Sequence, residues 1–361
     1  MYNFINSFLP APRQGGFAMP GYWVWCGSVI KGEDGRYHMF AARWPQSTPF
    51  TPGWLFYSEV VRASSDTYTG PFRFEEVVLQ ARGRKYFDGM ATHNPVIRKH
   101  GGKYLLYYMG TSYDFTPDET DKHEGERFWE AWYNKRIGLA VSDSVFGPWR
   151  RPDAPLFEPR KDKWDFYGNT NPAPWIMDDG KVYMFYKSLT RDRHLNIGLA
   201  TADNFAGPYQ RADHQLRLDR SQEHTDIEDP FLWYQDGSFH MLAKDITGNI
   251  CGEQYAGIYA FSRDCVSWET SRQPKAYSKT VAWDDGDITV QGALERPQLL
   301  IEDGRPTCMY AATSRGKTGF WNAEASWNMA IPIDGKKLCG EKKWSKPRTV
   351  KSSQYEMLPV K

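Results

Sequence analysis

Five copies of one short pattern constrain this chain more than any other feature of its sequence. Four copies place a largely polar pair before a proline: His93-Asn94-Pro95, Thr170-Asn171-Pro172, Glu228-Asp229-Pro230 and Glu295-Arg296-Pro297. The first copy is Cys26-Gly27-Ser28, with serine in the proline position. Successive copies, which we call anchors, are 58 to 77 residues apart, so five such units account for nearly all 361 residues.

Each anchor leads into the same succession of strand signals. A glycine turn introduces a second apolar run, as at 102–107 and 180–185, and a third run follows, as at 137–142 and 197–201. In three units a Gly-Pro-aromatic turn, for example at 147–149, then precedes an outer run. Four strands in each of five units predict an all-β fold: a five-bladed β-propeller with four-stranded antiparallel blades around a central pocket.

The prediction is a single domain that spans residues 1–361. Its blades are expected roughly at 22–82, 86–159, 164–218, 225–280 and 285–350. Proline has no N–H to donate, so it belongs on an edge strand or at a strand start, and the innermost strand of a blade is such an edge. The alternative is a β-sandwich with proline-rich turns, which has no reason to repeat one order of strands five times.

An insertion at 113–134 interrupts the second unit and is rich in acidic and aromatic residues, among them Phe128, Trp129 and Trp132. Three interpretations stay open for it. It forms a loop with a short helix that covers the pocket, it contacts a second subunit and so supports an oligomer, or it is a solvated insertion without a role.

The amino-acid composition restricts the classes of molecule that the protein is expected to bind. The chain has 45 Lys and Arg against 44 Asp and Glu, a net charge of +1, which argues against nucleic acid or an anionic membrane as the main partner. Aromatic residues make up 16% of the chain, which suits stacking on an oligosaccharide but also packing between sheets. Five cysteines without a CxxC pair indicate neither a disulfide scaffold nor a zinc site.

Targeting signals are absent from the sequence as it stands. The N-terminal stretch, residues 1–20, has no basic segment followed by an apolar one, and no apolar run approaches the length that spans a bilayer. This predicts a cytoplasmic protein. A signal peptide removed from a longer precursor would instead place it in the periplasm or outside the cell.

Carboxylates on converging strands are the candidate catalytic groups. The inner strands of a propeller converge, so the anchor side chains are expected to cluster around the axis at one end, with Glu228 and Glu295 among them. Glycoside hydrolysis needs one protonated carboxyl group and one carboxylate. We expect Asp229 to raise the pKa of Glu228, as the general acid, and Arg296 to keep Glu295 ionised, as base or nucleophile. The alternative is that either glutamate is a structural ion-pair residue.

Aromatic-aspartate pairs precede some anchors, among them Phe87-Asp88 and Trp164-Asp165. Asp88 is a candidate third acid or catalytic base, and Asp165 a candidate substrate-binding residue at the pocket rim; capping of a turn is the alternative for both. The remaining candidate substrate-binding residues lie on or beside the anchors: Trp23, Trp25, His93, Asn94, Asn171, Asp229 and Arg296. Trp23 and Trp25 are expected to give one ring to the channel and one to the blade core. No second histidine stands at ligand spacing from His93, so no metal ligand is predicted.

At these anchors the chain resembles the five-bladed propeller glycosidases of glycoside hydrolase families 43, 32, 62 and 117, through the repeated pattern that covers nearly the whole chain. The resemblance implies hydrolysis of a terminal sugar, often a furanoside or an anhydro-sugar, from a plant or algal oligosaccharide. The family 43 pattern has an aspartate base on the first blade, a second aspartate on a later blade and a glutamate acid. Glu228 matches the acid, Cys26-Gly27 offers no carboxylate for the base, and Asp88 is the candidate replacement.

The resemblance implies no required cofactor, although the group often carries a structural ion in the central channel, which nothing in this sequence specifies. Two alternatives remain. The missing carboxylate at Cys26-Gly27 fits a carbohydrate-binding propeller without catalysis. A propeller glycoside phosphorylase would need several basic residues around phosphate, and the anchors offer only Arg296.

Overall fold

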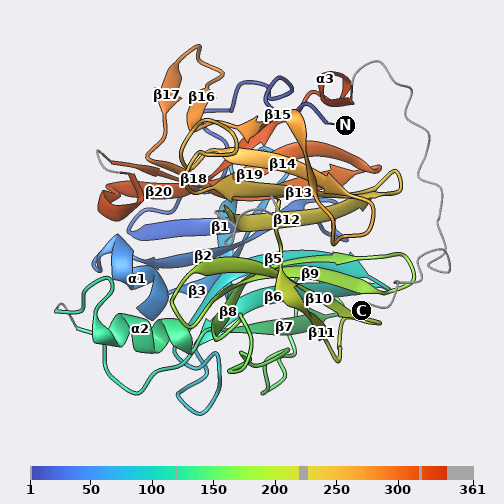
Figure 1. Ribbon diagram of the computed structural model, residues 1–361. Coiled ribbons are helices and arrows are strands. Elements are labelled where there is room, and N and C mark those ends of the chain that lie inside the picture. Colours follow the sequence, from blue (N-terminus) through green and yellow to red (C-terminus); the bar gives the residue numbers. More distant parts are fainter. Residues whose placement is uncertain (1, 119, 219–226, 317–318, 340–361) are drawn as a thin grey trace.

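The computed structural model describes residues 2–118, 120–218, 227–316 and 319–339. Five antiparallel sheets follow one another along the chain and form the five blades of a β-propeller, as predicted (Figure 1). Parts of the expected fourth and fifth blades, 225–226 and 340–350, lie outside the described residues.

Three blades have four strands in chain order. Blade 1 consists of β1 (Tyr22–Lys31), β2 (Tyr37–Pro45), β3 (Glu59–Ser65) and β4 (Arg73–Leu79). Blade 3 consists of β8 (Tyr167–Ile176), β9 (Val182–Leu189), β10 (Leu195–Ala202) and β11 (Gln210–Gln215). Blade 4 consists of β12 (Ile227–Gln235), β13 (Ser238–Asp245), β14 (Gly257–Ser262) and β15 (Glu269–Tyr277).

In the described residues, the other two blades have three strands each. Blade 2 consists of β5 (Ala91–His100), β6 (Lys103–Thr111) and β7 (Arg136–Ser142). Blade 5 consists of β18 (Ala293–Glu302), β19 (Arg305–Arg315) and β20 (Ala325–Pro332). The fourth position is reduced to one bridge in each: Arg150 pairs with Val141 of β7, and Phe17 pairs with Asn328 of β20. The prediction of four-stranded blades is therefore confirmed for blades 1, 3 and 4, whereas the described residues give blades 2 and 5 three strands and one bridge.

The anchors are β-bulges on the inner strands. Pairing with the second strand shifts register at the same point in each blade, where two residues of the inner strand protrude. The first of the two has a positive φ in all five blades: Cys26 (59°), Asn94 (52°), Asn171 (52°), Asp229 (57°) and Arg296 (54°). Proline follows in four blades, where the interrupted ladder needs no N–H from it.

The bulges correct the register assumed for the first anchor. Cys26 is equivalent to Asn94, so Gly27, and not Ser28, occupies the proline position of blade 1. A Cβ on Gly27 would lie 2.7 Å from the Met39 sulfur and 2.8 Å from the Asn328 side chain, which leaves room only for glycine there.

The N-terminal segment closes the ring. Phe17 exchanges two backbone hydrogen bonds with Asn328 of β20, the third strand of blade 5, and so takes its outer position although it precedes blade 1. Leu9 donates to the carbonyl of Pro332 at the end of the same strand. Phe17 is 1% exposed and packs between the first and last blades.

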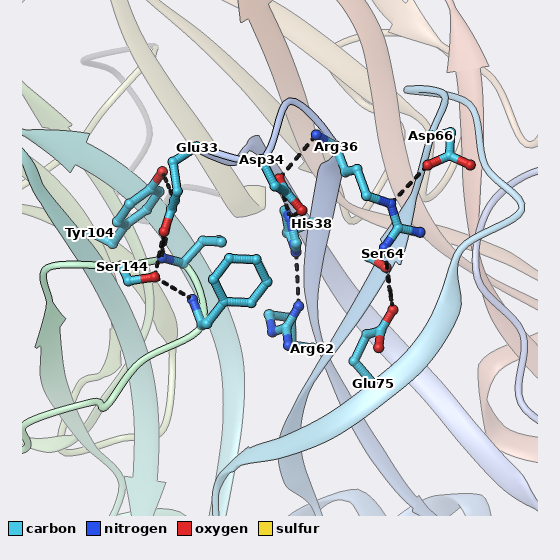
Figure 2. A network of polar contacts seen from close by, with 12 residues as sticks. Glu33, Asp34, Arg36, His38, Arg62, Ser64, Asp66, Glu75, Tyr104 and Ser144 are labelled. Carbon is cyan, nitrogen blue, oxygen red and sulfur yellow. Dashed lines mark hydrogen bonds and ion pairs between the residues drawn. The ribbon is translucent and has the colours of Figure 1, made fainter.

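Polar contacts also fasten blade 1 to blade 2, at the turn between β1 and β2 (Figure 2). Glu33 accepts hydrogen bonds from the Tyr104 hydroxyl (2.6 Å), from the Ser144 hydroxyl and from the Val145 amide (3.1 Å). Burial opposes the charge of Glu33, but these hydrogen bonds lower its pKa to about 2. Beside it Asp34 contacts the buried His38 ring at 3.0 Å, and Arg62 contacts the other ring nitrogen.

Two helices lie together at one side of the blades (Figure 1). α1 (Phe50–Phe56) follows β2, and α2 (Glu126–Tyr133) lies in the insertion at 113–134 and packs against α1 and β8 (Figure 1). The remaining elements are the hairpin of β16 (Thr280–Ala282) and β17 (Ile288–Val290), the 3-10 helix η1 (Gly319–Asn322) and α3 (Gly335–Cys339). Within the described part of the chain, no helix has the length and apolar character needed to cross a membrane.

Candidate active site

The anchors of blades 2 to 5 and Trp25 of blade 1 meet at one partly open pocket, with about 450 Å³ of empty space that includes solvent at its mouth. Eight of the eleven residues predicted for the site line it: Trp25, His93, Asn94, Asn171, Glu228, Asp229, Glu295 and Arg296. Further aromatic rings come from β2, from α1 and from η1, in the form of Trp44, Phe50, Trp54 and Phe320. Two lysines, Lys135 and Lys187, complete the lining.

The bulge residues form a chain of hydrogen bonds around the axis. Cys26 donates to Asn94 Oδ1 (2.8 Å), Asn94 Nδ2 to Asn171 Oδ1 (2.7 Å), and Asn171 Nδ2 to Asp229 Oδ1 (2.6 Å). Asp229 Oδ2 accepts from the backbone amide of Arg296 (3.3 Å). The bulge therefore turns the side chains of Cys26, Asn94 and Asn171 toward the bulge residue of the next blade. This chain of hydrogen bonds fixes the backbone positions from which the preceding residues, such as Glu228, enter the pocket.

Glu228 and Glu295 are the first anchor residues of blades 4 and 5, and one ammonium group joins them. Lys244 Nζ lies 2.8 Å from Glu228 Oε2 and 3.0 Å from Glu295 Oε1. Lys187 Nζ contacts the other oxygen of Glu228. Glu228 is thus held between two lysines, whereas Glu295 has one.

The surroundings give the two carboxyl groups opposite pKa shifts. Burial would raise the pKa of Glu228, but the charges of Lys187 and Lys244 outweigh it and hold this pKa well below its usual range. Burial raises the pKa of Glu295; Lys244 opposes the shift, while Asp229 and Glu228 add to it. Glu228 is therefore the ionised member of the pair and Glu295 the one more readily protonated.

This is the reverse of what the sequence suggested. Asp229 does lie beside Glu228, but its repulsion is overcome by two lysines that the anchors do not contain. Arg296 approaches Asp229 at 3.6 Å and forms no ion pair with Glu295 among the described residues. The expectation that Arg296 keeps Glu295 ionised was wrong for that reason.

The sequence analysis did not predict the three lysines of the site, although the sequence pattern around Lys187 and Lys244 could have indicated them. Lys187 and Lys244 occupy equivalent places on the second strands of blades 3 and 4, directly across from the first anchor residues Thr170 and Glu228. Each is a lone cation within an otherwise buried run, and a lysine is rarely buried without a partner. Lys135 follows α2, and its carbonyl accepts a hydrogen bond from the Asn169 amide (2.8 Å). No repeat marks it.

His93 is a neutral ring in the wall. It is 4% exposed, its Nδ1 lies 3.1 Å from the Ser58 hydroxyl, and Trp44 and Trp54 contact its ring. Burial lowers the pKa of His93 well below its usual value, and the charge of Arg296 adds to this. Within the described residues, no group of three His, Cys, Asp or Glu side chains is arranged to hold a metal ion.

Trp25 lines the pocket, whereas Trp23 does not. Both rings contact Phe50 edge-on, at 5.1 and 5.4 Å between centroids, so they lie on the same side of β1. Residues two apart on a strand share a face. The expectation of one ring in the channel and one in the blade core was wrong on this point; Trp23 stands behind the pocket wall and donates to the Thr48 carbonyl (2.9 Å).

Asp88 and Asp165 are not brought to the pocket. Asp88 is fully buried and accepts from Arg82 (2.8 Å), Arg151 (3.1 Å) and the Tyr108 hydroxyl (2.8 Å). Asp165 repeats this arrangement with Arg160 (2.8 Å), Arg211 (2.8 Å) and Tyr186 (2.9 Å). The aromatic-aspartate pattern therefore marks a structural site, in which a buried aspartate is held by two arginines. These contacts join the segment before the inner strand of a blade to the segment at its outer edge.

The aromatic half of each pair has a place in the same clamp. Phe87 stacks on Tyr108 and Trp164 on Tyr186, each with 24° between the rings. A glycine on the third strand makes room for them, because a Cβ at Gly198 would lie 2.3 Å from Trp164. These residues therefore position blades 2 and 3, and the pocket is built without them.

The chain folds as a five-bladed β-propeller with paired carboxyl groups in its pocket, and the fold is shared with solved glycoside hydrolases. The family 117 glycoside hydrolase Zg3597 of the marine bacterium Zobellia galactanivorans superposes with a TM-score of 0.63 and 17% identity, over 96% of this chain and 94% of that one. The RGII complex of BT0996 gives 0.63 and 15%, over 97% and 96%. The Bacillus subtilis arabinanase Arb43A gives 0.55 and 13%, over 91% and 97%.

These structural similarities, at 13 to 17% identity, establish the fold only. The chemistry of this protein must therefore be argued from the residues of its own pocket. No protein-family model matches the sequence, and no curated protein matches it.

Proposed function

We propose that this protein is a glycoside hydrolase that cleaves a terminal glycosidic bond of an oligosaccharide. The observation that carries the proposal is the Glu228–Lys244–Glu295 arrangement: two carboxyl groups on adjacent blades, in one pocket, with pKa values shifted in opposite directions. Glycoside hydrolysis requires such a pair. The aromatic wall suits the apolar faces of a sugar ring.

In the proposed mechanism Glu295 is the general acid and Glu228 the nucleophile. Glu295 gives its proton to the glycosidic oxygen as the bond to the anomeric carbon breaks, and the Glu228 carboxylate attacks that carbon from the other face. Water then releases the sugar, with Glu295 returning as base. Lys187 and Lys244 hold Glu228 ionised and fix its orientation.

The contacts of Lys244 are compatible with a nucleophile at Glu228. The two oxygens that share Lys244 lie 2.8 and 3.0 Å from it and are therefore at most about 6 Å apart. Close carboxyl groups, roughly 5–5.5 Å apart, are typical of retaining enzymes. We expect the first sugar released to keep its anomeric configuration, as observed by NMR during early turnover. Inversion would assign Glu228 the role of base.

Single substitutions test the roles. Glu228→Gln and Glu295→Gln are assayed on oligosaccharides and on aryl glycosides, starting with the furanosides and anhydro-sugars of plant and algal polysaccharides that the family resemblance implies. Loss of the general acid should lower turnover by about 10² to 10⁴ on oligosaccharides and far less on dinitrophenyl glycosides, whose leaving group needs no proton. Loss of Glu228 should abolish turnover on both.

A matched control is Glu269→Gln, an exposed carboxyl group on β15, which should behave as wild type. Undiminished turnover in both pocket variants would refute the assignment. Oligosaccharide binding without new reducing ends over long incubation would instead favour a carbohydrate-binding propeller.

A glycoside phosphorylase is the second candidate, and one observation favours it. Lys135 and Lys187 line the pocket together with Arg296, so the site holds more cations than the anchors alone provide. Turnover that depends on inorganic phosphate and yields a sugar phosphate would establish this activity. Turnover in phosphate-free buffer at an unchanged rate would exclude it.

A further inference from the structure

Lys135 is a buried lysine in the pocket, and its ammonium group forms no ion pair with any residue that the structure describes. The residue is 1% exposed, and its Nζ lies 3.4 Å from the centroid of the Trp132 ring and 5.3 Å from that of Trp54. Among the described residues, Nζ makes no hydrogen bond and no ion pair, in contrast to the paired Lys187 and Lys244. A buried ammonium group is costly when no anion balances it.

Arg296 is a second cation with unused donors in the same pocket. It is 3% exposed, and its Nε, Nη1 and Nη2 atoms all lack a hydrogen-bond partner in the described structure. Its one ion-pair contact, to Asp229, is long at 3.6 Å. The buried guanidinium group therefore has donors left for a ligand.

The charge of the pocket is unbalanced toward the positive side. Its lining contains the cations Lys135, Lys187 and Arg296, and Lys244 lies behind the carboxyl groups. The anions are Glu228, Asp229 and Glu295. With Glu295 protonated, as the proposed acid must be, and Lys135 in its charged form, four cations face two carboxylates. A neutral sugar would supply no anion to balance Lys135 in that form.

We propose that the pocket recognises an acidic sugar, one that carries a carboxylate or a sulfate ester whose oxygens bind Lys135. The proposal rests on the proposed function, because it names the substrate class of the same site. Lys135 stands near Lys187 and Glu228, so the anionic group belongs to the sugar unit whose bond is cleaved. Trp54, which contacts both Lys135 and His93, is placed to pack against that unit.

Without a ligand, the surroundings of Lys135 disfavour its charged form. Burial, with the repulsion of Lys187, lowers the pKa of Lys135 well below its usual value, and attraction to Glu228 only partly opposes this. An anion bound at Nζ would favour the charged form and raise that pKa. The alternative is that Lys135 serves only to pack on Trp132, in which case a neutral side chain of similar length would replace it without effect on ligands.

The test compares hexuronic acids with their methyl esters, and sulfated sugars with their unsulfated counterparts, as ligands followed by NMR titration. Each pair differs in charge and shares the sugar. Wild type should bind at least one acidic member roughly ten- to a hundredfold more tightly than its neutral counterpart, the effect of a charge-assisted hydrogen bond. Lys135→Met should lose that preference.

Lys181→Met is the matched control. Lys181 immediately precedes β9 and does not line the pocket, so the same substitution there should leave ligand binding unchanged. This variant should keep the preference for the acidic sugar. Equal affinity for every acid and its neutral counterpart would overturn the proposal, and so would a preference that survives in Lys135→Met. The comparison in wild type decides even if that variant fails to fold.

Inorganic phosphate and sulfate form a separate arm. Lys135-dependent binding of inorganic phosphate, with no preference for any acidic sugar, would overturn the acidic-sugar class and assign the subsite to free phosphate. Failure of the two proposals is distinguishable. Lys135-dependent binding of acidic sugars without hydrolysis would refute the glycosidase alone. Hydrolysis by wild type that shows no preference for an acidic glycoside over its neutral counterpart would refute the acidic subsite alone.

Discussion

Among the side chains that the structure describes, Lys244 alone forms ion pairs with both carboxyl groups of the proposed reaction. It stands on β13 directly across from Glu228, and its charge lowers the pKa of Glu228 and of Glu295 alike. The anionic neighbours in turn outweigh the effect of burial and raise the pKa of Lys244 itself, so that it stays charged. A pH profile should therefore respond to this residue in a specific way.

Lys244→Met is expected to move the whole pH profile of kcat/KM to higher pH. The acidic limb reports Glu228, which must be ionised, and the basic limb reports Glu295, which must be protonated; loss of the Lys244 charge raises both pKa values. Lys187→Met is the matched variant, since Lys187 contacts only Glu228 and should move mainly the acidic limb. Profiles that coincide with wild type in both variants would contradict the assigned roles.

Asp88→Asn separates a structural from a catalytic role for this residue. Because Asp88 is buried between Arg82 and Arg151, loss of its charge leaves both cations without their partner and should cost about 3–5 kcal/mol of unfolding free energy. The measurement is urea denaturation, with kcat/KM corrected for the folded fraction. We expect corrected activity within about threefold of wild type. A loss comparable to that of Glu228→Gln would place Asp88 in the chemistry.

At the scale of the element, the inner strands could be predicted from the sequence because their signal is local and repeated. Asn94, Asn171 and Asp229 precede proline in one register, and the bulge they form is what turns their side chains inward. The first anchor was misplaced by one residue because Cys26-Gly27 lacks the proline that marks the others.

The lysines show where this reasoning ends. The role of Lys244 depends on which residue lies across from it on the neighbouring strand, and that is fixed by register rather than by neighbours in sequence. Lys135 depends on how an insertion folds back over blade 3, which no repeat predicts. The carboxyl groups were therefore foreseeable, whereas the charges that assign their roles were not.

The turn between β1 and β2 yields a prediction about acid stability. The carboxylate of Glu33 joins blade 1 to Tyr104 and Ser144 of blade 2, and its folded-state pKa is lowered to about 2 from an ordinary value of 4.5. A lowered pKa contributes stability that is present above pH 4.5 and disappears as the pH falls toward 2. Glu33→Gln should therefore have a lower Tm than wild type at pH 7.

The Tm difference between Glu33→Gln and wild type should shrink as the pH is lowered from 5 toward 2.5. Thermal unfolding followed by circular dichroism across this range measures it. Asp66→Asn, an exposed carboxyl group in the same network that pairs with Arg36 at the surface, should change Tm little at any pH (Figure 2). A Glu33→Gln difference that is constant with pH would mean that the side chain acts by shape alone.

For the whole molecule, the decisive contact is the closure of the ring between its first and last parts. The five blades converge on one pocket, so the relative position of Glu228 on blade 4 and Trp25 on blade 1 depends on every interface between them. The N-terminal segment supplies the last of these by pairing with β20. A propeller that opens at this seam would lose its pocket as well as its stability.

Phe17→Ala tests the seam. The ring is 1% exposed and packs with residues of blades 1 and 5, so its removal should cost about 3–5 kcal/mol. Leu9→Ala is the control from the same segment, because Leu9 is 40% exposed and should cost less than about 1 kcal/mol. Urea denaturation followed by tryptophan fluorescence gives both values. If closure holds the blades as one cooperative unit, Phe17→Ala should lower the urea midpoint and leave a single unfolding transition. A separate early transition would show that the terminal blades open independently. An unchanged midpoint would show that the N-terminal segment does not stabilise the ring.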